Sequence, residues 1–230
     1  MFLTVKNKCL DISHIKAVIF DMDGTLVESE HIWSEAKQSI ARDAGINIAE
    51  DGLNKYIGRG LNDFIDEVLT SMHKSHCAEM NRKIQKRVLV DYGSKIRVID
   101  GAIEILDAFS LAGIRLAICS SDLLQAIESS LRALRATESI EVIVSGDTLT
   151  CGKPNPLPYL LTLKRLCLDA KHTIVFEDTG AGLVSATTAG ISTVVVGQDA
   201  EKSNFSKVLC VDPLLKGFRI SLDSNNEDRS

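Results

Sequence analysis

Two aspartates stand two residues apart near the N-terminus, at positions 21 and 23. The apolar run Ile15–Phe20 precedes Asp21 and is typical of a buried parallel strand whose two faces are covered by helices. Gly24 allows a sharp turn after Asp23, and the Thr25 hydroxyl can orient a carboxylate. In an open α/β sheet, ligands bind at the carboxyl ends of the strands. We therefore predict that the two aspartates belong to a binding or catalytic site.

Three further groups of polar residues follow predicted strands. They contain the adjacent serines Ser120 and Ser121, then Lys153, and then the acidic pair Glu177 and Asp178. Right-handed crossovers bring the carboxyl ends of all parallel strands to one edge of the sheet. The sequence therefore predicts a single site that holds several carboxylates, one lysine and hydroxyl groups.

This set of side chains suits phosphoryl transfer. Mg²⁺ prefers oxygen ligands, which Asp21, the carbonyl of Asp23 and Asp178 can supply. One carboxylate can attack phosphorus to form an aspartyl-phosphate, while a second protonates the leaving oxygen and then activates water. A lysine and a hydroxyl at a helix N-terminus stabilise the phosphoryl oxygens. We therefore predict magnesium as the cofactor and a small phosphorylated metabolite as the partner.

The elements that must position these residues alternate between strand and helix, which predicts an α/β fold with a doubly wound parallel sheet. Further strands are predicted at 115–119, 141–144, 173–176 and 192–196, with helices at 102–112, 123–134, 157–168 and 182–189. Between about 27 and 95 there are three amphipathic helical patterns, at 32–44, 61–72 and about 78–90, and no convincing strand. We expect a core of residues 15–28 and 96–220, a helical cap of residues 29–95, and a tail without regular structure from Leu214 onward.

Composition narrows the class of protein. The chain has 230 residues, 45% of them hydrophobic and 25% charged, which fits one or two globular units. Its formal net charge of −5 argues against nucleic-acid binding and against anionic membranes. No segment reads as a membrane span or a signal peptide, and six scattered cysteines fit free thiols in a reducing compartment. We therefore expect a cytoplasmic protein, and we favour a monomer.

The four groups of polar residues, in this order, resemble the motifs of the haloacid dehalogenase superfamily, in the group of β-phosphoglucomutase and small sugar phosphatases. The resemblance covers about Ile15–Val196 and implies a Rossmannoid core with a helical cap inserted after the first motif. It implies that Asp21 is the nucleophile and Asp23 the general acid and base. It also implies that the serine pair and Lys153 bind phosphate and that Asp178 ligates magnesium. Glu177 is expected either to ligate the metal directly or to lie in its outer shell.

Three functions remain open at this point. A carboxylate at position 23 favours phosphate esters over halides and phosphonates within this superfamily, because an alkoxide leaving group needs a proton. A phosphatase is favoured over a phosphomutase, since Trp33 stands where β-phosphoglucomutases place a histidine and Leu61 where they place an arginine. A non-catalytic protein that binds phosphorylated metabolites is the third possibility. The candidates for contacts between the cap and the substrate are Glu28, Trp33, Gly58 and Arg59.

Overall fold

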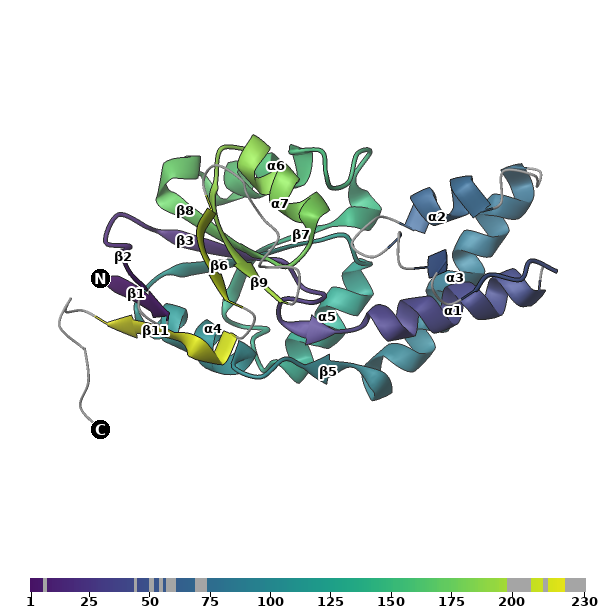
Figure 1. Cartoon of the computed structure of the whole chain (residues 1–230), viewed down its shortest axis with the longest axis horizontal. Helices are drawn as coiled ribbons and strands as arrows, with labels where there is room; N and C mark the ends of the chain where they lie inside the picture. The colour runs from purple at the N-terminus through teal and green to yellow at the C-terminus, as the bar shows by residue number, and fades with distance from the viewer. Residues whose placement is uncertain are drawn as a thin grey trace.

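A parallel sheet of six strands forms the centre of the protein (Figure 1). The computed structural model describes residues 1–5, 8–43, 45–49, 52–53, 56, 61–68, 74–197, 208–212 and 215–221. The strand order is β10-β9-β8-β3-β6-β7, and all five pairings are parallel. The strands are β3 (Ala17–Phe20), β6 (Arg115–Ser120), β7 (Ile140–Ser145), β8 (Thr173–Glu177), β9 (Ser192–Val196) and β10 (Val208–Asp212).

Helices cover both faces of this sheet, as the predicted fold requires. The four helices are α4 (Ala102–Leu111), α5 (Leu124–Ala133), α6 (Leu157–Leu166) and α7 (Gly180–Thr188). Val18 and Phe20 of β3 pack with residues of α4 and α5, whereas Ala17 and Ile19 pack with residues of α6 and α7. Side chains of β3 therefore alternate between two apolar layers, which explains why this strand is continuously apolar. The α/β class with a doubly wound sheet is confirmed.

A second, antiparallel sheet was not predicted. It consists of β1 (Phe2–Val5), β2 (Lys8–Asp11) and β11 (Phe218–Ser221), with β1 in the middle. The expectation of an irregular tail from Leu214 onward is wrong for β11, because Phe218 is buried and its ring packs 5.4 Å from that of Phe176. Strands this short carry too little periodicity to be recognised locally, and the pairing joins opposite ends of the chain.

Among the described residues, three helices form a cap at the far end of the molecule from β1 and β11 (Figure 1). They are α1 (Glu30–Asp43), α2 (Leu61–Val68) and α3 (Lys74–Lys95), and they have their own apolar cluster, which includes Ile32, Phe64 and Ile84. The chain enters and leaves this cap through β4 (Val27–Glu28) and β5 (Arg97–Val98), which pair antiparallel. On this basis we propose the division into a core and a cap at about residues 28 and 96.

Candidate active site

Asp21 and Asp23 lie just beyond the carboxyl end of β3. The amide of Asp21 still donates to the carbonyl of Phe176 on β8, which fixes the backbone at the point where the carboxylates begin. Gly24 has a φ of +80°, and a Cβ at this position would lie 2.0 Å from Oδ2 of Asp178. Only glycine therefore permits this turn. The turn lets the loop that carries Asp21 and Asp23 lie against Asp178.

Lys153 joins two of the predicted acids. Its ammonium donates to Oδ1 of Asp21 and to Oε1 of Glu177, at 2.5 Å in both cases. The three side chains are 3%, 9% and 0% exposed, respectively. Because a buried charge is costly unless it is paired and hydrogen-bonded, these contacts fix the ammonium beside the carboxylate of Asp21. A positive charge at this position can stabilise negative oxygens on a group attached to Asp21.

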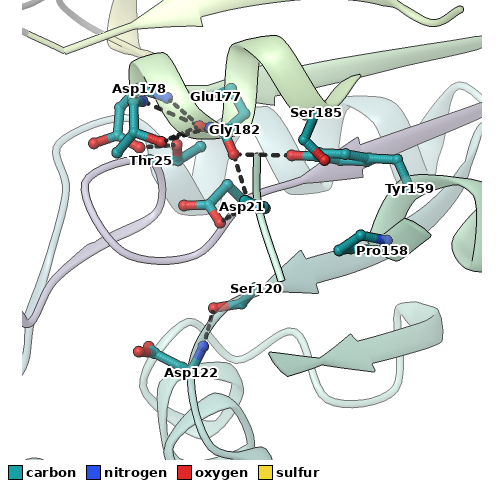
Figure 2. Close-up of polar contacts among 12 residues, drawn as sticks. Asp21, Thr25, Ser120, Asp122, Pro158, Tyr159, Glu177, Asp178, Gly182 and Ser185 are labelled. Carbon is teal, nitrogen blue, oxygen red and sulfur yellow. Dashed lines mark hydrogen bonds and ion pairs between the residues drawn. The ribbon is translucent and has the colours of Figure 1, made fainter. Parts of the chain in front are cut away.

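Glu177 is a fully buried acceptor for five donors. Its Oε1 accepts from Lys153 and from the Tyr159 hydroxyl at 2.9 Å. Its Oε2 accepts from the amides of Asp178 and Thr179 and from the Thr179 hydroxyl, at 3.0–3.1 Å. Figure 2 shows Glu177 above Asp21, with Tyr159 on one side and Asp178 on the other. These bonds favour a role for Glu177 in holding Lys153 and the 178–179 loop, rather than direct ligation of a metal.

Gly182 provides the space that Glu177 needs. A Cβ on Gly182 would lie 1.7 Å from Oε1 of Glu177. We expect Gly182→Ala to lower the free energy of unfolding, measured in urea, by about 1–3 kcal/mol, because the methyl group must displace a fully bonded carboxylate. Gly180→Ala in the same helix is the matched control, since a Cβ there meets nothing within 4 Å. Equal unfolding free energies for the two variants would contradict this account of the Glu177 pocket.

The serine pair lies at the end of β6. Ser120 is 3% exposed, and its hydroxyl accepts from the amide of Asp122 at 3.0 Å. Figure 2 places Ser120 on the opposite side of Asp21 from Glu177. Asp122, two residues after Ser120, is also buried, and it accepts from the Tyr92 hydroxyl of α3 at 3.2 Å. This hydrogen bond links α3 of the cap to the loop that follows β6. Because the two residues are 30 positions apart, no local sequence pattern predicts their contact.

The carboxylates of the site are crowded and buried. Burial raises the pKa of Asp21 to about 7, and the charge of Lys153 opposes the shift. Burial raises the pKa of Asp23 to about 6, and the negative charge of Glu30 adds to it. Burial, Asp21 and Glu177 raise the pKa of Asp178 well above its usual range. A bound cation would offset this repulsion.

The donor set fits a hard divalent cation. One carboxylate oxygen from each of Asp21, Glu177 and Asp178 lies within 4.8 Å of the other two. The set offers oxygen atoms and neither sulfur nor imidazole, which is the chemistry that Mg²⁺ and similar ions prefer. Since the oxygens of Glu177 already accept from five donors, we regard Asp21 and Asp178 as the better ligands of the three.

A cavity of about 260 Å³ lies between these residues and the cap. Asp21, Asp23, Ser120, Ser121, Lys153 and Asp178 line it from the core, and Glu28 and Trp33 line it from the cap side, together with Glu30, His31 and Lys37. The structure therefore gathers the predicted residues around one space, with Glu177 behind them. Gly58 and Arg59 lie outside the described residues. Sequence reasoning missed Glu30 and Lys37, because charged residues on an amphipathic helix usually lie on its solvated face.

Known proteins resemble this chain along most of its length. Residues 18–196 match the model of a family described as haloacid dehalogenase-like hydrolase. A validoxylamine A 7'-phosphate phosphatase from Streptomyces hygroscopicus is 29% identical over 199 residues, which are 86% of this chain and 93% of that protein. A phosphorylated carbohydrates phosphatase from Thermotoga maritima is 28% identical over 181 residues, with 78% and 84% coverage. The predicted enzyme class, phosphoric monoester hydrolase, is the class of these named relatives.

Solved structures agree with the fold. CbbY from Rhodobacter sphaeroides, in complex with phosphate, superimposes with a TM-score of 0.78 at 24% identity and covers 88% of this chain and 95% of its own. A β-phosphoglucomutase from Clostridium difficile gives 0.77 at 21% identity, with 88% and 92% coverage. No helix among the described residues is long and apolar enough to span a membrane. Because the family model matches residues 18–196, the chain belongs to the haloacid dehalogenase-like hydrolase family.

Proposed function

We propose that the protein is a magnesium-dependent phosphatase that hydrolyses a small sugar phosphate through an aspartyl-phosphate intermediate. The observation that carries the proposal is the pairing of Asp21 with Lys153 at the floor of a cavity, with Asp23 two residues further on. The relative named as a phosphorylated carbohydrates phosphatase supports the same substrate class. We also propose that the protein is cytoplasmic and monomeric.

In the first step a carboxylate oxygen of Asp21 attacks phosphorus, and the bond from phosphorus to the ester oxygen breaks. The ammonium of Lys153, which already touches Asp21, then lies beside the phosphoryl oxygens. The hydroxyls of Ser120 and Ser121 reach the cavity from the end of β6 and can donate to the same oxygens. Hydrogen bonds hold Lys153 and Ser120 before the substrate binds, so these two groups need little reorganisation during the reaction.

Asp23 transfers the proton. The backbone amide of Ser29 donates to its Oδ1 at 2.7 Å, which holds the carboxyl group at the entrance to the cap. Its pKa of about 6 lies close to neutral pH, where an acid can both give and recover a proton. In its protonated form Asp23 protonates the leaving alkoxide. As a carboxylate it then takes a proton from the water that attacks the aspartyl-phosphate and releases inorganic phosphate.

Asp21, Asp178 and the carbonyl of Asp23 are the proposed metal ligands. When bound, Mg²⁺ supplies positive charge that offsets the repulsion between these carboxylates and a phosphate group. Thr25 orients Asp178 through a hydrogen bond of 3.3 Å to Oδ1. Glu177 acts from behind, because its bonds to the 178–179 amides fix the loop that carries Asp178.

We expect removal of the metal to stop hydrolysis. Purified protein incubated with p-nitrophenyl phosphate and Mg²⁺ should release p-nitrophenolate, and excess EDTA should lower the rate by about 10²-fold or more. Added Mg²⁺ in excess of the chelator should restore it, whereas Ca²⁺, with its longer bonds and looser geometry, should restore less. A rate that does not respond to EDTA would refute the metal requirement.

A second assay, with glucose 1-phosphate, separates the phosphatase from the phosphomutase alternative. Glucose 1-phosphate should yield inorganic phosphate in a phosphatase and glucose 6-phosphate in a mutase. Leu61 and Asp122 line the cavity at the cap and at the core, and neither side chain can pair with a second phosphate. These two positions of the cavity therefore support the phosphatase. The third possibility, a non-catalytic binding protein, would release no phosphate from either substrate.

A further inference from the structure

Lys37 is a buried cation in the wall of the cavity. It lies on α1, its side chain is 4% exposed, and it lines the cavity opposite the core residues. Its ammonium lies 3.6 Å from Oε1 of Glu30, two helical turns earlier. Lysine is rarely buried unless it is paired. Glu30 and Lys37 act on Asp23 only through their charges. The proposed chemistry gives neither residue a contact with the substrate, so the burial of this ion pair in the cavity wall needs a separate explanation.

Trp33 supplies a second, independent observation. It occupies the helix positions between Glu30 and Lys37, so the three side chains share one face of α1. Trp33 also lines the cavity and is 7% exposed, and within the described part of the chain its indole N–H has no hydrogen-bond partner. A buried donor without a partner is costly, and a bound ligand with an acceptor oxygen would satisfy it. We call Glu30, Trp33 and Lys37 the α1 stripe.

The charges around the cavity indicate which ligand the α1 stripe accepts. Among the described residues that line it there are seven carboxyl groups and two lysines. Lys153 is paired with Asp21 and Glu177, and Lys37 is paired with Glu30. Two of the seven carboxyl groups, those of Asp122 and Asp147, lie on the core side. A second phosphate or a carboxylate on the substrate would therefore lie among like charges, with both of these cations already neutralised.

Neutral hydroxyl groups of a substrate can bind at the cap side of the cavity without this electrostatic repulsion. A sugar hydroxyl can donate to a carboxylate oxygen of Glu30 and accept from the ammonium of Lys37 or the indole N–H of Trp33. Asn81 and Gln85 of α3 also line the cavity and add amide groups, which both donate and accept. The cap side of the cavity therefore offers donors and acceptors together, as recognition of a polyol requires.

We propose that the α1 stripe is the subsite for the leaving group and that it selects a neutral, polyhydroxylated leaving group over one that carries a second phosphate or a carboxylate. Lys37 is the specificity-determining residue, because it supplies the donor while Glu30 cancels its charge. The inference rests on the proposed phosphatase function, since the leaving group is the part of the substrate that Asp23 would protonate.

The test compares substrates with different leaving groups. We would measure kcat/KM for a panel of hexose, pentose and hexitol monophosphates, for fructose 1,6-bisphosphate and 2-phosphoglycolate, and for p-nitrophenyl phosphate, whose leaving group has no hydroxyl. The best sugar monophosphate should exceed both substrates with a second anionic group by about tenfold or more. Lys37→Met should lower the ratio of the best sugar monophosphate to p-nitrophenyl phosphate by about tenfold.

Three further variants separate recognition from structure. Lys83→Met, a matched change at a lysine of α3 that is 58% exposed and paired with Glu79, should leave that ratio within about twofold. Glu30→Gln should raise the relative rate with 2-phosphoglycolate, because the charge of Lys37 is then no longer neutralised. Lys37→Gln, which keeps an N–H donor, should retain more of the sugar preference than Lys37→Met. Thermal unfolding of each variant reports whether the fold is intact.

Each remaining result overturns a stated part of the inference. A wild-type preference for 2-phosphoglycolate or the bisphosphate would show that Lys37 binds an anion and would overturn the subsite. An equal loss on every substrate in Lys37→Met would indicate a structural role and would also overturn it. Absence of any phosphatase activity would overturn the proposed function and with it the subsite, whereas activity without these preferences would overturn the subsite alone.

Discussion

Asp21→Asn is expected to lower phosphatase turnover by about 10⁴-fold or more, because an amide oxygen is a poor nucleophile towards phosphorus. The substitution keeps the size of the side chain and an oxygen that can accept from Lys153, so the geometry of the site is retained. The measurement is the release of inorganic phosphate from the best sugar monophosphate at saturating Mg²⁺. Retained activity would contradict the assignment of Asp21 as the nucleophile.

The stability of the same variant gives an independent check. Asp21 has a folded-state pKa raised to about 7 from 3.8, so its ionised form is less favourable in the folded state than in the unfolded state. Its contribution to stability is therefore present below about pH 4 and lost as the pH rises through 7. In metal-free protein at pH 8, Asp21→Asn should melt no lower than wild type. Asp107→Asn, at an exposed position on α4, is the matched control for both measurements.

Sequence patterns predicted the part of the site that lies on the core strands. Asp21, Ser120 and Glu177 each end or directly follow an apolar run, and parallel strands carry their carboxyl ends to one edge whatever the details of packing. Sheet topology alone therefore brings these residues together. The same reasoning predicted the helical cap, because the three helical patterns after position 28 interrupt the alternation of strand and helix.

The contacts that depend on side-chain geometry could not be predicted in this way. Whether Glu177 ligates a metal depends on five donors, one of which, the Tyr159 hydroxyl, belongs to a residue 18 positions earlier. A charged residue such as Lys37 on an amphipathic helix is expected on the solvated face. It is buried because α1 forms part of the cavity wall. The bond between Tyr92 and Asp122 connects two elements that are adjacent only in space. Local periodicity contains no information on any of these three contacts.

Asp23→Asn should have the second largest effect, and its size should depend on the leaving group. An alkoxide needs a proton as it departs, so turnover of a sugar monophosphate should fall by about 10³-fold. A p-nitrophenolate leaves without one, so the first step with p-nitrophenyl phosphate should persist. Release of phosphate from Asp21 still needs a base, and the aspartyl-phosphate should accumulate. Stopped-flow measurements should then show a burst of p-nitrophenolate equal to the enzyme concentration, followed by slow turnover.

The burst distinguishes a proton carrier from a residue that only holds the metal or the turn. If Asp23 acted solely through its backbone carbonyl, Asp23→Asn would retain that ligand and both substrates would turn over at nearly the wild-type rate. If the substitution disturbed the loop that Ser29 holds, both substrates would lose activity by the same factor and no burst would appear. Asp100→Asn, at a residue whose side chain is 79% exposed and pairs with Lys216, controls for the change of charge. A large loss of turnover with the alkyl ester reports the protonation of the leaving group. A burst with the aryl ester reports the slow hydrolysis of the aspartyl-phosphate. Only the two results together assign both proton transfers to Asp23.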